Sequence, residues 1–75
     1  MSDHTYKITE IVGSSPDSID AAIRSGVARA STTLRNLDWF EVQHIRGYLG
    51  HSSEVQEFQV TLKLGFRYDE QTDET

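Results

Sequence analysis

The sequence predicts an α+β fold of order β-α-β-β, in which a three-stranded antiparallel sheet partly wraps one amphipathic helix. Apolar residues recur at three- and four-residue spacing from Ile19 to Leu37, which is typical of a helix that packs on one face. In residues 55–68, apolar and polar side chains alternate with a period of two from Phe58 onward, as in a half-buried strand. The polar segment 50–53 joins this strand to the one before it and predicts an antiparallel hairpin.

Residues 5–13 are predicted to form the first strand. Ile8, Ile11 and Val12 are β-branched, and Tyr6 also favours strands. The alternation is imperfect, because Tyr6 and Ile8 share one parity whereas Ile11 has the other. A bulge would explain this irregularity, and so would a strand that is partly buried on both faces.

The segment Gly13-Ser14-Ser15-Pro16 is predicted to end this strand and start the helix. Ser15 can accept hydrogen bonds from free backbone N–H groups, and Pro16 suits the first helical position. Asp17 and Asp20 would then lie in the first turn, where the helix dipole favours negative charge.

The helical pattern is a single apolar stripe over about five turns. The stripe consists of Ile19, Ala22, Ile23, Gly26, Val27, Ala30, Leu34 and Leu37, and the opposite face carries Asp20, Arg24, Arg29 and Arg35. Because Ala22, Gly26 and Ala30 are small, the helix is expected to lie close to its partner.

Residues 38–49 and 55–68 are the second and third predicted strands. One face of the third strand carries Phe58, Val60, Leu62, Leu64, Phe66 and Tyr68, and the other carries Gln59, Thr61, Lys63, Gly65 and Arg67. At about 3.3 Å per residue this strand spans roughly 46 Å, which is unusually long, so its end should overhang the subunit and contact a neighbour. Gly65, inside the strand, would permit a close approach between subunits.

Trp39 is the only tryptophan, and its place in the second strand is unusual. Phe40 and Val42 take one face of that strand, so Trp39 shares the other with the polar residues Glu41 and Gln43. A large aromatic side chain on a polar face needs another surface to cover it. A second subunit or a flat ligand could supply that surface.

Composition indicates one small domain, residues 1–75, with flexible tails expected at residues 1–4 and 69–75. Such a domain buries only about 60% of its unfolded surface and has no cysteines, so oligomerisation is the expected source of extra stability. The formal charge of −5 argues against a nucleic-acid partner. Membrane-span and signal-peptide patterns are absent from the sequence, so a soluble cytoplasmic protein is expected.

Several runs of the sequence resemble the dodecins, a family of small flavin-binding proteins. The runs are Glu10-Ile11-Val12-Gly13-Ser14-Ser15, Asp20-Ala21-Ala22-Ile23, Leu34-Arg35-Asn36-Leu37-Asp38-Trp39-Phe40-Glu41-Val42, Ile45-Arg46-Gly47 and Phe58-Gln59-Val60-Thr61-Leu62-Lys63-Leu64-Gly65-Phe66-Arg67. The resemblance implies a hollow dodecamer with helices outside, in which stacked flavin pairs lie between tryptophans of adjacent subunits. It also implies flavin storage, buffering and photoprotective quenching without enzymatic turnover. Bacterial dodecins favour flavin mononucleotide (FMN) over riboflavin, and some also hold coenzyme A.

Three residues match the flavin site of this family. The resemblance implies that Trp39 stacks on the isoalloxazine ring, Gln59 hydrogen-bonds its polar edge and Arg46 pairs with the flavin phosphate. An indole offers broad dispersion contact, a carboxamide offers both a donor and an acceptor, and a guanidinium can form two charge-assisted bonds to a phosphate. Trp39 and Arg46 have opposite parity, so a bulge between them or donation from different subunits must reconcile them. Tyr48 has the parity of Arg46 and matches a family position near the ligand.

The residue pattern alone leaves other interpretations open. Trp39 could anchor a subunit interface, Gln59 could be a solvated sheet residue, and Arg46 could form an intersubunit salt bridge. The alternative function is therefore a structural oligomeric assembly module without a cofactor. A flavin enzyme would need an acid or base beside the flavin and an open face for a substrate, and the sequence offers no catalytic candidate.

Other chemistry-bearing residues receive structural interpretations. His4, His44 and His51 do not have the spacing of a metal site and are interpreted as solvated side chains. Lys7 and Arg67 are cations that coenzyme A could use, although the sequence does not assign them to it.

Overall fold

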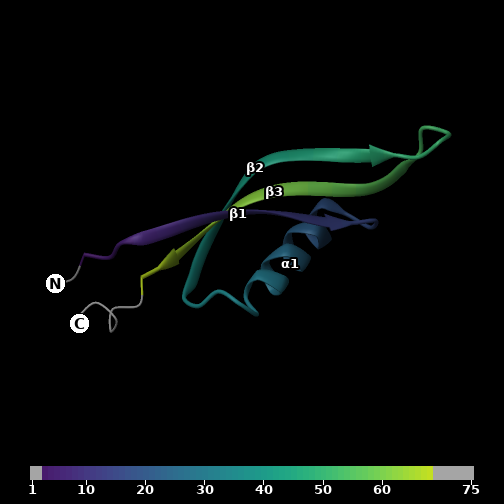
Figure 1. The fold of residues 1–75 in the computed structure, drawn as a ribbon. Coiled ribbons are helices and arrows are strands. Elements are labelled where there is room, and N and C mark those ends of the chain that lie inside the picture. Colours follow the sequence, from purple (N-terminus) through teal and green to yellow (C-terminus); the bar gives the residue numbers. More distant parts are fainter. Residues whose placement is uncertain (1–2, 69–75) are drawn as a thin grey trace.

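The computed structural model describes residues 3–68 and confirms the β-α-β-β order (Figure 1). Its elements are β1 (Tyr6–Ser15), α1 (Ile19–Ala30), β2 (Leu37–Leu49) and β3 (Val55–Arg67). Strand β3 lies in the middle of the sheet and pairs antiparallel with both β1 and β2. Of the predicted tails, residues 1–2 and 69–75 lie outside the described range. No helix within that range is long and apolar enough to cross a membrane.

Strand β1 runs two residues further than predicted and contains no bulge. Its register with β3 is continuous from Tyr6 opposite Arg67 to Ser15 opposite Phe58. The irregular parity arises instead because β1 carries apolar side chains on both of its faces. Ile11 packs against the core, whereas Ile8 and Val12 point to the opposite face and are exposed.

The helix starts later than predicted, at Ile19 rather than near Pro16. Backbone pairing with β3 keeps Ser15 extended, so its Oγ accepts a hydrogen bond from Asp17 N and does not cap α1. Ser18 is the N-cap, and its Oγ accepts from Ala21 N at 2.9 Å. Asp17 therefore lies before the helix.

The helix also ends earlier than the apolar stripe suggested, at Ala30. The hydroxyls of Ser31, Thr32 and Thr33 donate to backbone carbonyls three residues earlier, and such local bonds compete with further helix formation. Arg35 accordingly lies outside α1. The remaining stripe residues, Leu34 and Leu37, still pack against the core from the connection and from the start of β2.

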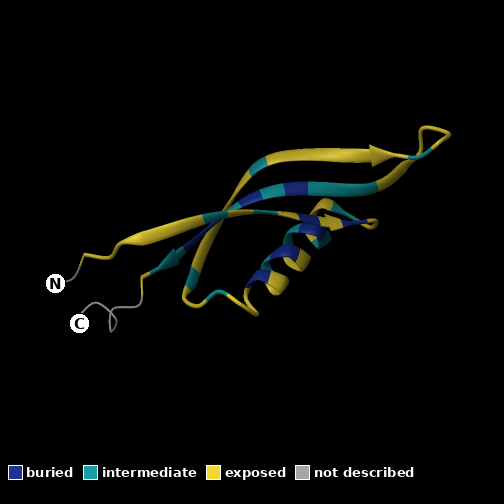
Figure 2. Cartoon of the chain, in the orientation of Figure 1, coloured by how far each residue is buried: buried dark blue, intermediate teal, exposed yellow. Residues whose placement is uncertain are grey.

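The core is small and lies between α1 and the sheet (Figure 2). Its buried apolar residues are Ala22, Ala30, Val60, Leu62 and Leu64. The small helix residues bring α1 close to β1, as predicted. A methyl group built on Gly26 would lie 3.2 Å from the Cα of Gly13, so no larger side chain fits at this crossing without displacement.

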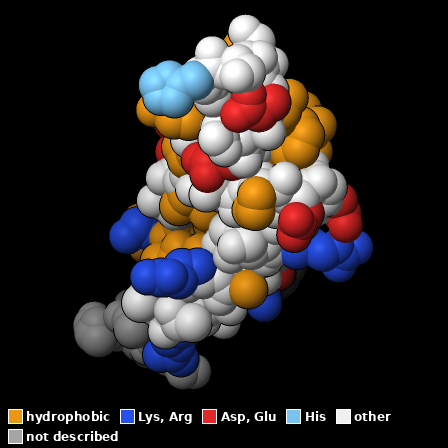
Figure 3. All heavy atoms as spheres, turned by 90° about the vertical axis from the view of Figure 1, so that its right-hand side faces the viewer, with side chains coloured by type: hydrophobic (Ala, Val, Ile, Leu, Met, Phe, Trp, Pro, Cys, Tyr) orange, Lys and Arg blue, Asp and Glu red, His pale blue; other side chains and the backbone are white. Residues whose placement is uncertain are grey.

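The β2–β3 hairpin projects beyond the rest of the subunit, as the length of the third strand predicted (Figure 1). Strand β1 pairs with β3 only as far as Phe58, so Val55 to Glu57 pair with β2 alone. Tyr48, Leu49 and Val55 are more than half exposed on this extension. Figure 3 shows hydrophobic side chains exposed among acidic ones at this end of the molecule.

Replacing Gly13 tests the close helix–strand contact. A Cβ at position 13 would overlap the carbonyl oxygen of Ala22 and lie 3.3 Å from the Cα of Gly26. Gly13→Ala should therefore lower the free energy of unfolding by about 1–3 kcal/mol. Urea denaturation at one fixed protein concentration measures this change. Gly47→Ala is the matched control, because its Cβ would meet only Glu57 O, at 4.0 Å, and equal midpoints for both variants would refute this packing account.

Candidate functional site

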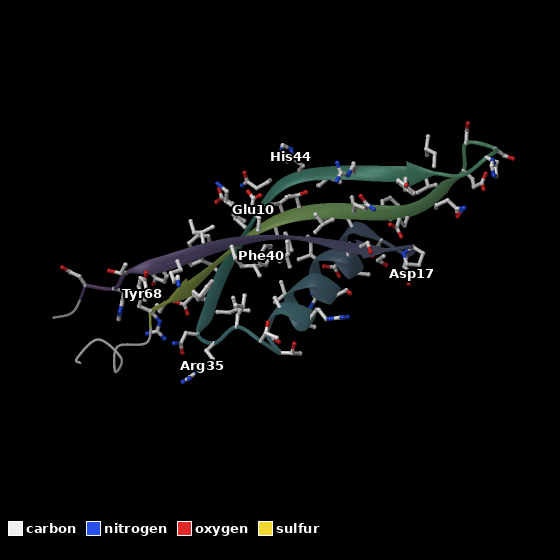
Figure 4. All side chains as sticks on the ribbon, viewed as in Figure 1. Glu10, Asp17, Arg35, Phe40, His44 and Tyr68 are labelled. Atoms are coloured by element: carbon white, nitrogen blue, oxygen red, sulfur yellow. The ribbon has the colours of Figure 1, made fainter. Side chains whose placement is uncertain are left out.

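The sheet face opposite α1, here called the open face, carries all three predicted site residues. Its ladder consists of Tyr6, Ile8, Glu10, Val12 and Ser14 on β1, Glu57, Gln59, Thr61, Lys63, Gly65 and Arg67 on β3, and Trp39, Glu41, His44, Arg46 and Tyr48 on β2. Figure 4 shows Glu10 and His44 projecting away from α1. The chain therefore offers one helix-covered face and one face without a helix.

A β-bulge at Gln43 places Trp39 and Arg46 on the same face. Val42 pairs with Leu62 and His44 with the next residue, Thr61, so Gln43 is an extra residue in β2. The bulge reverses the side-chain parity of everything after it. A bulge between Trp39 and Arg46 was one of the two explanations that their opposite parity in the sequence allowed.

Trp39 lies on Gly65, its neighbour across the β2–β3 ladder. A Cβ added to Gly65 would overlap the six-membered ring of the indole, so the missing side chain provides the space in which the ring lies. The Tyr6 ring lies beside it at 6.2 Å between centroids and an interplanar angle of 56°. Trp39 remains 38% exposed, which leaves indole surface available for a further contact.

Gly65 thus provides space for the Trp39 ring within the subunit, and its role in a close approach between subunits stays a prediction. Its role as a platform was not predicted because it depends on the register of β2 against β3. The available signal was a glycine on the polar side of a strand opposite an aromatic residue.

Arg46 and Gln59 are direct partners across the ladder. They belong to a hydrogen-bonded series of three side chains. Arg46 Nε donates to Gln59 Oε1 at 3.0 Å, and Gln59 Nε2 donates to Glu57 Oε2 at 2.9 Å. Glu57 was not predicted as a site residue. Tyr48 lies opposite Glu57 on the same face, so it is also close to these hydrogen-bonded side chains.

Trp39 and the Arg46–Gln59 pair form two separate groups within one subunit. Their partners on β3, Gly65 and Gln59, are six residues apart. At about 3.3 Å per residue this is roughly 20 Å along the strand, which exceeds the length of a flavin ring system. The two groups share a face of one subunit, but they do not meet in a single closed pocket.

A basic cavity of 310 Å³ lies at the other end of the sheet. Its lining includes Lys7, Arg35 and Arg67, together with Tyr68, whose ring has the Lys7 Nζ at 5.3 Å from its centroid. Arg67 Nε is also 3.4 Å from Asp38 Oδ2. The two cations considered for coenzyme A, Lys7 and Arg67, therefore line the same hollow.

The three histidines lie far apart in the fold. His4 precedes β1, His44 is in the middle of β2, and His51 is in the β2–β3 turn. Within residues 3–68, no group of three or more acidic or histidine side chains converges in a way that could hold a metal ion.

Comparison with known proteins identifies the family. The dodecin family model matches residues 5–69. A curated dodecin from Thermus thermophilus is 52% identical over 65 residues, covering 87% of this chain and 93% of that protein. The solved structure of the dodecin from Streptomyces davaonensis has a TM-score of 0.86 at 56% identity, covering 91% of this chain and 98% of the other.

The dodecin structure from Streptomyces coelicolor gives the same TM-score of 0.86 at 56% identity, covering 92% of this chain and 97% of the other. The family-model match covers almost the whole sequence, and the structural matches reproduce the β-α-β-β fold. This chain belongs to the dodecin family of small flavin-binding proteins.

Proposed function

We propose that this protein is a flavin-storage and buffering protein that binds stacked pairs of FMN between Trp39 side chains at subunit interfaces. The observation that carries the proposal is the placement of Trp39, whose indole lies on Gly65 on the open face. The ring is held from one side and remains partly exposed. A planar isoalloxazine would cover that surface by offset stacking. An electron-rich indole in this contact would also quench excited flavin, which is the basis of a photoprotective role.

The second group, Arg46 and Gln59, has the chemistry to hold the polar parts of the ligand. Gln59 can offer a donor and an acceptor to the ring edge. Arg46 uses Nε to contact Gln59, and its terminal guanidinium nitrogens suit a phosphate. Because the two groups are roughly 20 Å apart along β3, we propose that Trp39 and Gln59 reach the same flavin from different subunits.

Incomplete burial within one subunit supports assembly. Helix α1 packs on β1 and β3, whereas the apolar side chains Phe40, Val42 and Ile45 on the same side of β2 stay exposed. A cavity of 390 Å³ is lined by Phe40 of β2 and by Ile23 and Val27 of α1. Oligomerisation, as in other dodecins, would cover such surface, and we propose the hollow dodecamer implied by the family resemblance.

Three further features belong to the proposed function. The cavity lined by Lys7 and Arg67 suits a phosphate-rich ligand, so coenzyme A is a second candidate for this protein. A chain without cysteines needs no oxidising compartment, so we propose the cytoplasm as its location. Neither site suggests catalytic turnover, since flavins stacked on each other and on Trp39 would be inaccessible to a substrate.

Flavin titration tests the main proposal. Adding the purified protein to FMN should quench flavin fluorescence. Trp39→Ala should remove most of the quenching, because the indole that stacks on the flavin is lost. Trp39→Phe, which keeps a smaller ring, should retain part of the affinity. Unquenched FMN with the wild-type protein would reject the proposal. If gel filtration still showed a large oligomer, that result would favour the alternative of a structural assembly module.

Replacement of Arg46 tests its phosphate role. Arg46→Ala should weaken FMN binding by about 10- to 100-fold, because a charge-assisted bond is lost. Riboflavin lacks the phosphate and should lose much less affinity. Arg46→Lys keeps the charge and should recover part of the FMN affinity. Equal losses for both flavins would show that Arg46 does not contact the phosphate.

Replacement of Gly65 tests the platform beneath Trp39. Gly65→Ala should displace the indole and weaken FMN binding by about 5- to 100-fold, given the usual cost of overpacking. Trp39 is the only tryptophan, so intrinsic fluorescence reports its displacement directly. Gly47→Ala serves as the control. Unchanged tryptophan emission and unchanged affinity in Gly65→Ala would contradict the platform role.

A further inference from the structure

We infer that Glu57 is a positioning residue of the flavin site: it sets the orientation of the Gln59 carboxamide and so determines which groups the flavin edge meets. The inference rests on the proposed function and adds a residue that neither the residue pattern nor the family resemblance had indicated. Glu57 acts through Gln59 and need not contact the ligand itself.

The geometry consists of two hydrogen bonds that meet on one side chain. Gln59 Oε1 accepts from Arg46 Nε at 3.0 Å, and Gln59 Nε2 donates to Glu57 Oε2 at 2.9 Å. Glu57 and Gln59 are two residues apart on β3, so their side chains project from the same face. Arg46 reaches Gln59 from the neighbouring strand.

The charges at the two ends allow only one orientation of the carboxamide. A guanidinium has donors and no acceptor, whereas an ionised carboxylate has acceptors and no donor. Gln59 can therefore satisfy both partners only when its oxygen faces Arg46 and its nitrogen faces Glu57. The opposite orientation would place two donors together at Arg46 and two acceptors together at Glu57.

This fixed orientation leaves a defined hydrogen-bonding pair for a ligand. Gln59 keeps one lone pair on Oε1 and one N–H on Nε2. The pyrimidine edge of a flavin presents an N–H donor beside carbonyl acceptors, which is the complementary pattern. Because the side chain is already ordered, binding does not have to supply the entropy cost of ordering it.

Removing the acceptor at position 57 should therefore weaken flavin binding without any change in direct contacts. Glu57→Ala should raise the Kd for riboflavin by about 2- to 10-fold, the range expected for ordering one flexible side chain on binding. Glu57→Gln keeps an acceptor oxygen at the same distance along the side chain, so it should stay closer to wild type. Riboflavin is the probe because it has no phosphate. Loss of the Glu57 charge therefore cannot change its affinity through an interaction with a phosphate.

A double-mutant cycle separates a positioning role from a direct contact. Riboflavin affinities are compared for the wild type, Glu57→Ala, Gln59→Ala and the double variant, with gel filtration to confirm the same oligomer. If Glu57 acts through Gln59, its removal has no further effect once Gln59 is absent. Glu54→Ala is the control, because it removes an equal charge from the same hairpin and has no contact with Gln59 in the described hydrogen bonds.

The outcomes distinguish this inference from the proposed function. A wild-type protein that binds neither FMN nor riboflavin contradicts the proposed function itself. A wild-type protein that binds riboflavin, with Glu57→Ala equal to it, overturns only the positioning role. If removal of Glu57 causes the same loss of riboflavin affinity in the presence and absence of Gln59, the positioning role is also overturned, because Glu57 would then act by another route. A loss that appears only when Gln59 is present, with recovery in Glu57→Gln, supports it.

Discussion

The register in which β2 pairs with β3 is the constraint on which the rest of the site depends. It places Trp39 over Gly65 and Arg46 beside Gln59. With Trp39 over Gly65, the second juxtaposition requires the extra residue at Gln43, since a strand without the bulge would direct Arg46 to the face that carries α1. Bulges commonly redirect side chains, and this one directs Arg46 to the face that carries Trp39.

A second constraint is that one short helix must serve a wide sheet. Helix α1 approaches β1 through the Gly13–Gly26 crossing and covers β1 and β3. The apolar side chains of β2 and the whole open face lack such a cover within the described chain. Because the buried core is so small, the subunit has the surface of a component of an assembly, in agreement with its family.

Electrostatics and packing act on different parts of the open face. Around Trp39 the determinant is steric, because a missing Cβ at Gly65 creates a flat seat for an aromatic ring. Around Gln59 it is charge, because Arg46 and Glu57 allow one orientation of an otherwise ambiguous carboxamide. Under the proposed function, the first group would stack on a planar ligand and the second would form defined hydrogen bonds to its edge.

The sequence alone determined the order of elements, the core face of β3 and the polar side on which Trp39 lies, because side-chain period follows directly from local backbone geometry. The opposite parity of Trp39 and Arg46 also required either a bulge between them or their donation from different subunits. Local signals misplaced both ends of α1, since pairing with β3 holds Ser15 extended and hydroxyl groups after Ala30 compete for the helix carbonyls. Only tertiary structure brought Gly65 under Trp39 and joined Glu57 to Gln59, because both depend on contacts that the strand register and side-chain conformations create.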